Sequence, residues 1–286
     1  MMGLLSGLES LGLGDLKEKE VFEKEAPKVT ESGTVVPVTE KTELDVLFDK
    51  TFKCPVCNRD FTSKMIRAGK NKLLKQDTDL RGIYDTADVV KYDAILCPHC
   101  GFAALNRFFK PLPTAQEKLI RDKICINFKG VKAPEGEYSY DDAILRYKLA
   151  LACTIVKCGK NSEKAYVCLK LAWTYRGKAE HLPADTENRD AVLKQLKAAE
   201  LECLQNAYEG FNAAFSTEPF PMCGMDETTV MYISAEVARR IGKLDEAGRL
   251  ASSIITSRVA GERIKEKARE IKELVKKQKE AQAGAQ

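Results

Sequence analysis

Two pairs of cysteines are the residues of this sequence with the clearest chemistry. Cys54 and Cys57 enclose Pro-Val, and Cys97 and Cys100 enclose Pro-His. Two thiolates separated by two residues bind one metal ion from a tight turn, and two such turns complete a tetrahedral site. The sequence therefore predicts that all four cysteines hold one metal. Zinc is favoured as the commoner structural ion, and iron is the alternative because rubredoxin-like sites share the Cys-Pro-x-Cys-Gly form.

The residues around both pairs favour compact turns. Phe52 and Phe61 flank the first pair and are expected to cover it, while Gly101 follows the second pair, where such a turn needs a positive φ. The long insert between the pairs is expected to form hairpins that bring the two turns face to face. His99 is expected to be exposed, or to support a ligand, rather than to bind the metal itself.

A polar set within the insert is the candidate for a second site. Asp77, Asp79 and Arg81 follow one another at alternate positions. They could bind a ligand or a second cation, and an enzyme built on this set is one hypothesis. The alternative, which we favour, is an Asx-turn at Asp77 with Arg81 paired to a carboxylate.

The same insert is basic. Between residues 59 and 75 the only acidic residue is Asp60, and the basic residues are Arg59, Lys64, Arg67, Lys70, Lys72 and Lys75. Such a run could follow a phosphate backbone, with nearby aromatic side chains stacking on bases. The simpler interpretation is a solvated face. Nucleic-acid binding is therefore an alternative function, and it predicts binding that weakens steeply with salt.

The remaining cysteines carry weaker signals. Five fall in helical patterns beside apolar neighbours and are expected to be buried, namely Cys125, Cys153, Cys158, Cys168 and Cys203. Cys223 lies in a Pro-Met-Cys-Gly-Met loop, where exposure would make it a reactive thiol. However, His181 is the only histidine outside the second cysteine pair, so a Cys/His catalytic pair is disfavoured.

Composition places the chain among globular proteins. It has 286 residues and a formal net charge of +4, and no apolar run approaches the ~20 residues that cross a bilayer. The first residues of the sequence include no basic cluster ahead of the apolar ones, so they do not resemble a secretory signal. Ten cysteines without an export signal indicate a reducing compartment, and we expect a cytoplasmic location.

The first 45 residues carry twice as many acidic as basic side chains and few bulky apolar groups. This composition predicts a flexible acidic segment. An alternative is a short helix that docks on a partner or a membrane surface, but three glycines weaken it. Its apolar face would comprise Leu4, Leu5, Leu8, Leu11 and Leu13.

From residue 112 onward the apolar pattern becomes helical. Thr114, Ser139 and Asp226 are the expected N-caps of three of these helices. Ala235, Gly242 and Ala247 stand where a tetratricopeptide unit places a small residue, a turn glycine and an alanine at the helix crossing. Helices are expected over 114–129, 139–159, 162–179, 186–215, 227–241, 245–256 and 262–279.

Several of these motifs together resemble an uncharacterised bacterial family known as domain of unknown function 2225. The likeness covers nearly all of the chain from about Asp45 onward. It implies a zinc-ribbon-like segment with a tetratricopeptide-like body, a cytoplasmic location and no assigned activity. The motifs are Phe52-Lys-Cys-Pro-Val-Cys57, Gln76-Asp-Thr-Asp-Leu-Arg81, Tyr92-Asp-Ala-Ile-Leu-Cys-Pro-His-Cys-Gly-Phe-Ala-Ala104, Phe220-Pro-Met-Cys-Gly-Met-Asp226 and Arg239-Arg-Ile-Gly-Lys243.

We therefore predict an α+β protein that is mainly α: a small zinc-ribbon-like β domain followed by a tetratricopeptide-like antiparallel helical array. The expected segments are 1–45 flexible, 46–112 zinc-ribbon-like, 113–280 helical and 281–286 disordered. The leading function is an intracellular, zinc-containing binding or scaffold protein that recognises a protein or peptide through its array. Enzymatic activity is the less favoured hypothesis.

Overall fold

The computed structural model describes residues 41–132 and 134–284, and the described residues from Lys41 onward form one compact unit. The predicted flexible segment and its leucine-rich face lie almost entirely outside this range. Three short antiparallel hairpins come first. Their strands are β1 (Leu47–Lys53), β2 (Asp60–Ile66), β3 (Leu73–Gln76), β4 (Gly82–Tyr84), β5 (Ala94–Leu96) and β6 (Ala103–Leu105).

Helices make up the rest of the compact unit. The α-helices are α1 (Thr114–Ile120), α2 (Tyr140–Val156), α3 (Asn161–Glu180), α4 (Arg189–Thr217), α5 (Glu227–Arg240), α6 (Leu244–Thr256) and α7 (Glu262–Gly284). A π-helical turn, η6 (Arg121–Cys125), continues α1. Short 3-10 turns are η3 (Glu43–Val46), η4 (Val89–Tyr92) and η5 (Asn106–Phe108).

Local sequence explains where several helices begin and end. Ser139 caps α2 in a reciprocal pair with Asp142, and the Asp226 carboxylate accepts from the Thr229 amide at the start of α5. Gly242 ends α5 with a φ of 82°, which lets the Lys243 amide bond back to the Ala238 carbonyl. These caps match the sequence-based expectations.

Several helix ends differ from expectation. Thr114 is the first residue of α1 rather than its cap, because Pro113 occupies the cap position and provides no side-chain hydrogen bond. The helical turns after it stop at Cys125 instead of reaching residue 129. At the other end, α7 continues to Gly284, into the stretch predicted as a tail.

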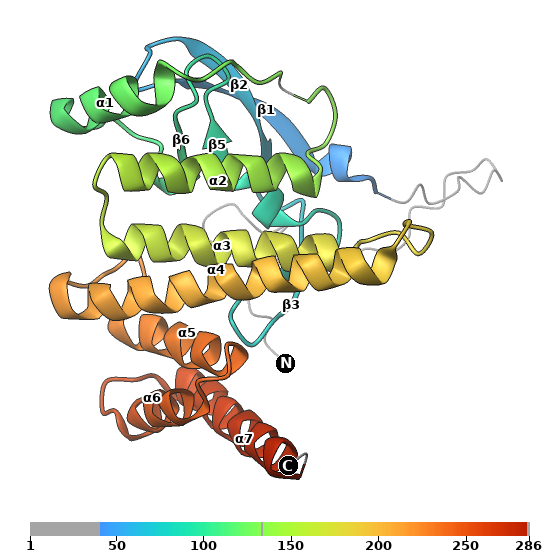
Figure 1. Cartoon of the computed structure of the whole chain (residues 1–286), viewed down its shortest axis with the longest axis vertical. Helices are drawn as coiled ribbons and strands as arrows, with labels where there is room; N and C mark the ends of the chain where they lie inside the picture. Colours follow the sequence, from blue (N-terminus) through green and yellow to red (C-terminus); the bar gives the residue numbers. More distant parts are fainter. Residues whose placement is uncertain (1–40, 133, 285–286) are drawn as a thin grey trace, which may run out of the picture. The chain divides into compact units, whose positions relative to one another are not determined.

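The helices stack in layers beneath the second cysteine hairpin. In Figure 1, β5 and β6 lie above α2, which is followed in turn by α3, α4, α5 and the α6–α7 pair. One continuous apolar core joins Leu96 and Ala103 of this hairpin to Tyr147 of α2, Trp173 of α3 and Phe211 of α4. The predicted segments 46–112 and 113–280 therefore pack against each other through buried side chains.

The expected fold class is confirmed: small antiparallel sheets precede a mainly helical array. Ala235 and Ala247 are fully buried where α5 and α6 pack together, and Gly242 forms the turn between the two helices. Among the described residues, no helix combines the length and the apolar character that crossing a membrane requires.

Candidate functional site

Each cysteine pair closes a β-hairpin, and the two turns are built alike. The Asn58 amide donates to the Cys54 carbonyl at 2.9 Å, and the Gly101 amide donates to the Cys97 carbonyl at 3.1 Å. Asn58 and Gly101 both have left-handed backbones, with φ of 59° and 78°. Gly101 thus meets the expectation for its turn, and asparagine serves the other turn because it tolerates this conformation.

The four thiols converge between the two turns. The sulfurs of Cys54 and Cys100 are 3.6 Å apart, as are those of Cys57 and Cys97. All four lie within 4.8 Å of one another, and only Cys57 is not buried. Sulfurs bound tetrahedrally at the Zn–S distance would be about 3.8 Å apart. The four predicted cysteines therefore form one cluster of a size that holds a single metal ion.

The thiols interact strongly with one another. Hydrogen bonds from Cys100 and Cys54 lower the pKa of Cys97, whereas the hydrogen bond with Cys54 raises the pKa of Cys100. Ionisation of all four thiols would require a counter-charge, because three of the four side chains are buried. A bound cation is the simplest source of that charge.

Aromatic rings and α2 enclose the cluster. The predicted cover of Phe52 and Phe61 is present, with ring centroids 5.9 Å apart, and Phe109 packs edge-on against both rings. Cys153 of α2 reaches the second turn, where its sulfur accepts from the Ala103 amide at 3.4 Å. His99 is exposed, with Nε2 lying 3.4 Å from the Asp60 carbonyl oxygen, and is not one of the clustered residues.

The predicted polar set lies at the tip of the β3–β4 hairpin, pressed against α3 and α5. Asp79 has no exposed surface and accepts hydrogen bonds from both terminal nitrogens of Arg176 at 3.1 and 2.7 Å, and from Trp173 Nε1 at 3.0 Å. Arg81 pairs with Asp77 and Glu180. The charges of all three predicted residues are neutralised by protein partners.

This buried network extends beyond the predicted residues. Arg176 also binds Glu200 of α4 at 2.8 Å, and Thr78 hydrogen-bonds to Glu236 and Arg240 of α5. Burial favours a raised pKa for Asp79, but the hydrogen bonds and charge of Arg176 outweigh it and lower that pKa below its usual value. Asp79 is therefore an ionised, fully paired carboxylate inside the protein.

Sequence reasoning missed the helical half of this network, although one signal was present. Glu200 lies in line with Leu196 and Leu204, four residues away on either side, so it occupies the buried face of α4. A charged residue on an apolar helix face needs a buried partner. The identity of that partner was not visible, because Arg176 and Asp79 are 97 residues apart.

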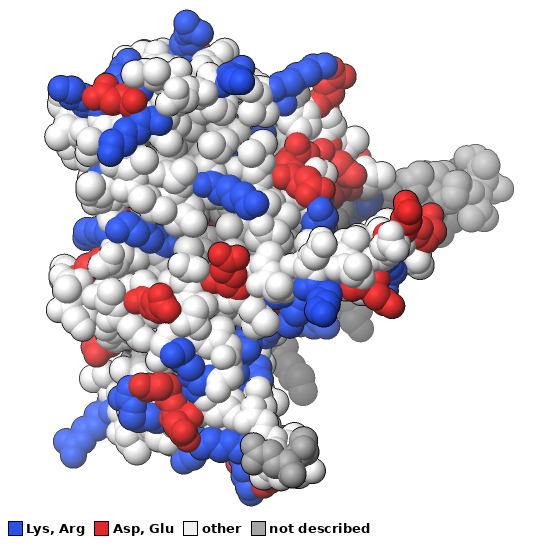
Figure 2. Space-filling view, in the orientation of Figure 1, with Lys and Arg blue, Asp and Glu red and all other residues white. Residues whose placement is uncertain are grey.

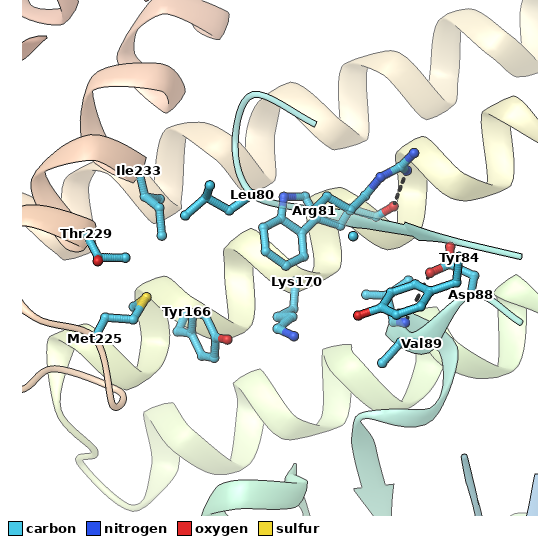
Figure 3. Close-up of a pocket in the computed structure, with 13 residues that line it drawn as sticks. Leu80, Arg81, Tyr84, Asp88, Val89, Tyr166, Lys170, Met225, Thr229 and Ile233 are labelled. Carbon is cyan, nitrogen blue, oxygen red and sulfur yellow. Dashed lines mark hydrogen bonds between the residues drawn. The ribbon is translucent and has the colours of Figure 1, made fainter. Parts of the chain in front are cut away.

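A cavity of about 260 Å³ lies beside the hairpin tip. Figure 3 shows Leu80, Arg81 and Tyr84 of the hairpin on one side of it, facing Tyr166 and Lys170 of α3 and the Met225–Ile233 region. Lys170 is bound to Asp93 at 3.0 Å, and its ammonium group lies over the Tyr166 and Trp173 rings. A second cavity of about 360 Å³ continues on the other side of Leu80 and Thr229.

The predicted basic run is divided between two hairpins. Lys64 pairs with Asp49 at 3.1 Å, and Arg67 Nε donates to the Leu47 carbonyl at 2.9 Å. The others are exposed: Arg59 follows the first cysteine turn, while Lys70, Lys72 and Lys75 lie on or beside β3. Nucleic-acid contact by this set stays a prediction.

The remaining cysteines differ from expectation at four positions. Cys125 and Cys203, expected to be buried, are half-buried. Cys158, expected to be buried, is exposed because it turns the chain between α2 and α3. Cys223 is half-buried and donates to the Ser162 carbonyl at 3.3 Å, and burial raises its pKa to about 11. His181 contacts the Tyr140 hydroxyl at 3.1 Å instead of a thiol.

The fold and the site define a mainly helical protein with a four-cysteine cluster at its β-rich end. Residues 47–275 match a family described as an uncharacterized protein conserved in bacteria, DUF2225, and the chain belongs to that family. This membership agrees with the resemblance in its sequence motifs. No curated protein and no solved structure matches the chain.

Proposed function

We propose that this protein is an intracellular, zinc-containing binding protein that recognises an acidic peptide segment through its helical array. Zinc has a structural role in this proposal. Four cysteine ligands would fill a tetrahedral site and leave no position open for substrate. None of the ten cysteines is in a disulfide, which supports a reducing compartment.

The metal proposal has a direct test. Elemental analysis of the untagged protein is expected to give about one zinc per chain. Counting reactive thiols in the native sample should find Cys54, Cys57, Cys97 and Cys100 protected. Iron at the same stoichiometry would contradict the zinc assignment, and absence of any metal would contradict the metal site itself.

The groove beside the hairpin is the observation that carries the binding proposal. Its two cavities meet at Leu80, whose backbone is left-handed with a φ of 68°. This conformation is costly for leucine, by roughly 1–2 kcal/mol. The hairpin tip is held in place by the buried network, so it forms a rigid wall of the groove.

The charge of the groove indicates the partner's chemistry. Arg263 and Lys267 of α7 line the second cavity together with Ile264, and neither cation has an ion-pair partner within the described ranges. The acidic residue beside them, Asp226, is already used to cap α5. An extended segment with an apolar side chain and flanking carboxylates complements this surface.

Charge reversal on α7 tests this binding. Peptides selected from a random displayed library against the full-length protein are expected to combine acidic and apolar residues. Arg263→Glu with Lys267→Glu should weaken their binding about tenfold or more, since each reversal replaces attraction by repulsion. Fluorescence anisotropy with labelled peptides measures the change.

The matched control is Lys272→Glu with Lys277→Glu, two exposed lysines of the same helix. It makes the same change in net charge and should leave peptide affinity within about twofold, because neither lysine lines the cavity and solvent and salt screen exposed charges. Equal loss in both variants, or failure to select any peptide, would contradict the proposal.

A further inference from the structure

We propose that a second cleft, distinct from the peptide groove, binds a small polyanion. The cleft lies between the segment after β6, the turn that joins α2 to α3, and the Pro221–Gly224 turn before α5. Its volume is about 630 Å³, within the roughly 300–1,000 Å³ of small-molecule sites. It shares no lining residue with the two cavities beside the hairpin.

The cleft concentrates positive charge. Its basic residues are Arg107, Lys110, Lys157 and Lys160, and its one acidic residue, Glu163, is bound to Lys157 at 2.6 Å. The other three cations have no ion-pair partner in the part of the chain that the structure describes. Figure 2 shows Lys and Arg side chains gathered at the left of the view, where α2 turns into α3.

Unpaired cations that line one concave surface repel one another and attract anions. Walls of low polarity strengthen this field by excluding water. Part of the wall here is apolar, since Phe108, Leu112 and three prolines also line the cleft. A ligand with two or more negative charges would relieve the repulsion. Phosphate esters and polycarboxylates both have this chemistry.

Arg107 is already held in position. Its guanidinium donates to the Cys223 carbonyl and lies 5.6 Å from the centre of the Tyr166 ring. Gly224 makes this possible, since a Cβ there would lie 2.8 Å from Arg107 Nη2. An anchored cation loses little side-chain entropy when a ligand binds. The N-terminus of α3 is not part of the proposed site, because the Glu218 carboxylate already accepts a hydrogen bond from the Ser162 amide.

Titration with two probes tests the proposal and separates the two sources of anion. Calorimetry at low ionic strength is expected to detect binding of pyrophosphate, citrate or both to the full-length protein, and the tighter probe identifies the class of ligand. Lys110→Gln with Lys160→Gln should weaken that binding about tenfold. Neither lysine makes an ion pair within the described ranges, so folding should persist.

Lys194→Gln with Lys277→Gln is the control, because it removes the same charge from exposed positions on α4 and α7. This variant should bind the same probe with the affinity of the unmodified protein. If neither probe binds, or if both double variants lose affinity equally, the proposal is overturned.

Cys158 localises the bound anion. Its thiol is exposed and lines the cleft, whereas Cys203 of α4 does not. The bound probe should therefore slow alkylation of Cys158 by iodoacetamide and leave the rate at Cys203 unchanged, as read by peptide mass spectrometry. Binding without protection of Cys158 would place the anion elsewhere and overturn the assignment.

Discussion

Replacing Asp79 with alanine is expected to lower the free energy of unfolding by about 3–5 kcal/mol, the usual effect of removing one partner from a buried ion pair. Asp79 is fully buried and binds Arg176 through both of its oxygens. Its removal takes away the carboxylate to which the Arg176 guanidinium and the Trp173 indole N–H both donate. Urea unfolding followed by circular dichroism measures the loss.

A surface ion pair provides the control. Asp49 pairs with Lys64 at 3.1 Å, but its side chain is 61% exposed. Asp49→Ala should therefore cost less than about 1 kcal/mol. If both variants lose the same small amount, Asp79 is not the paired, buried group described above.

The pH dependence of the same site provides an independent check. The pKa of Asp79 is lower in the folded protein than its usual value, so its ionised form stabilises the fold at pH values above that usual value. Asp79→Asn keeps the shape and removes this titration. The stability advantage of the unmodified protein over Asp79→Asn should be constant from pH 5 to 8. It should shrink as the pH falls below about 4.

Short-range sequence signals predicted much of this fold. Cysteines separated by two residues at the ends of two hairpins indicated the cluster, because the required geometry lies within one turn. Ser139 with Asp142 and the glycine at 242 indicated helix ends for the same reason, since capping involves residues at most a few positions apart.

The hairpin network depended on distant partners and could not be predicted in this way. Asp77 and Arg81 are four residues apart and could be paired from the sequence, but Asp79 meets Arg176 across 97 positions. Burial of Asp79 results from how the hairpin lies against α3 and α5. Leu80 carried no turn signal, because leucine rarely adopts a positive φ.

Removing the metal is the second change that we expect to destabilise the fold strongly. If zinc binds the four cysteines, a chelator with a thiol reductant should lower the midpoint of thermal unfolding by about 10 °C or more. A ligand present at about 1,000 times its Kd stabilises by about 4 kcal/mol, and each kcal/mol moves the midpoint by about 2–4 °C in a chain of this size.

The loss should spread beyond the two cysteine turns. The cluster shares its apolar surroundings with Ile120 of α1 and Cys153 of α2, so both helices lose a packing surface when the turns separate. Hydrogen exchange should therefore accelerate first in β1, β2, β5 and β6, then in α1 and α2. The buried contacts of α6 and α7 lie elsewhere, and exchange there should change least.

Paired substitutions separate metal loss from cysteine loss. Cys97→Ser should abolish stoichiometric zinc and reproduce the effect of the chelator, because it removes a ligand that lies 3.6 Å from Cys57. Cys203→Ser changes a half-buried cysteine of α4 outside the cluster and should retain the metal. A metal-free protein that unfolds at the same temperature as the untreated one would show that the cluster does not need a metal to hold the two hairpins together.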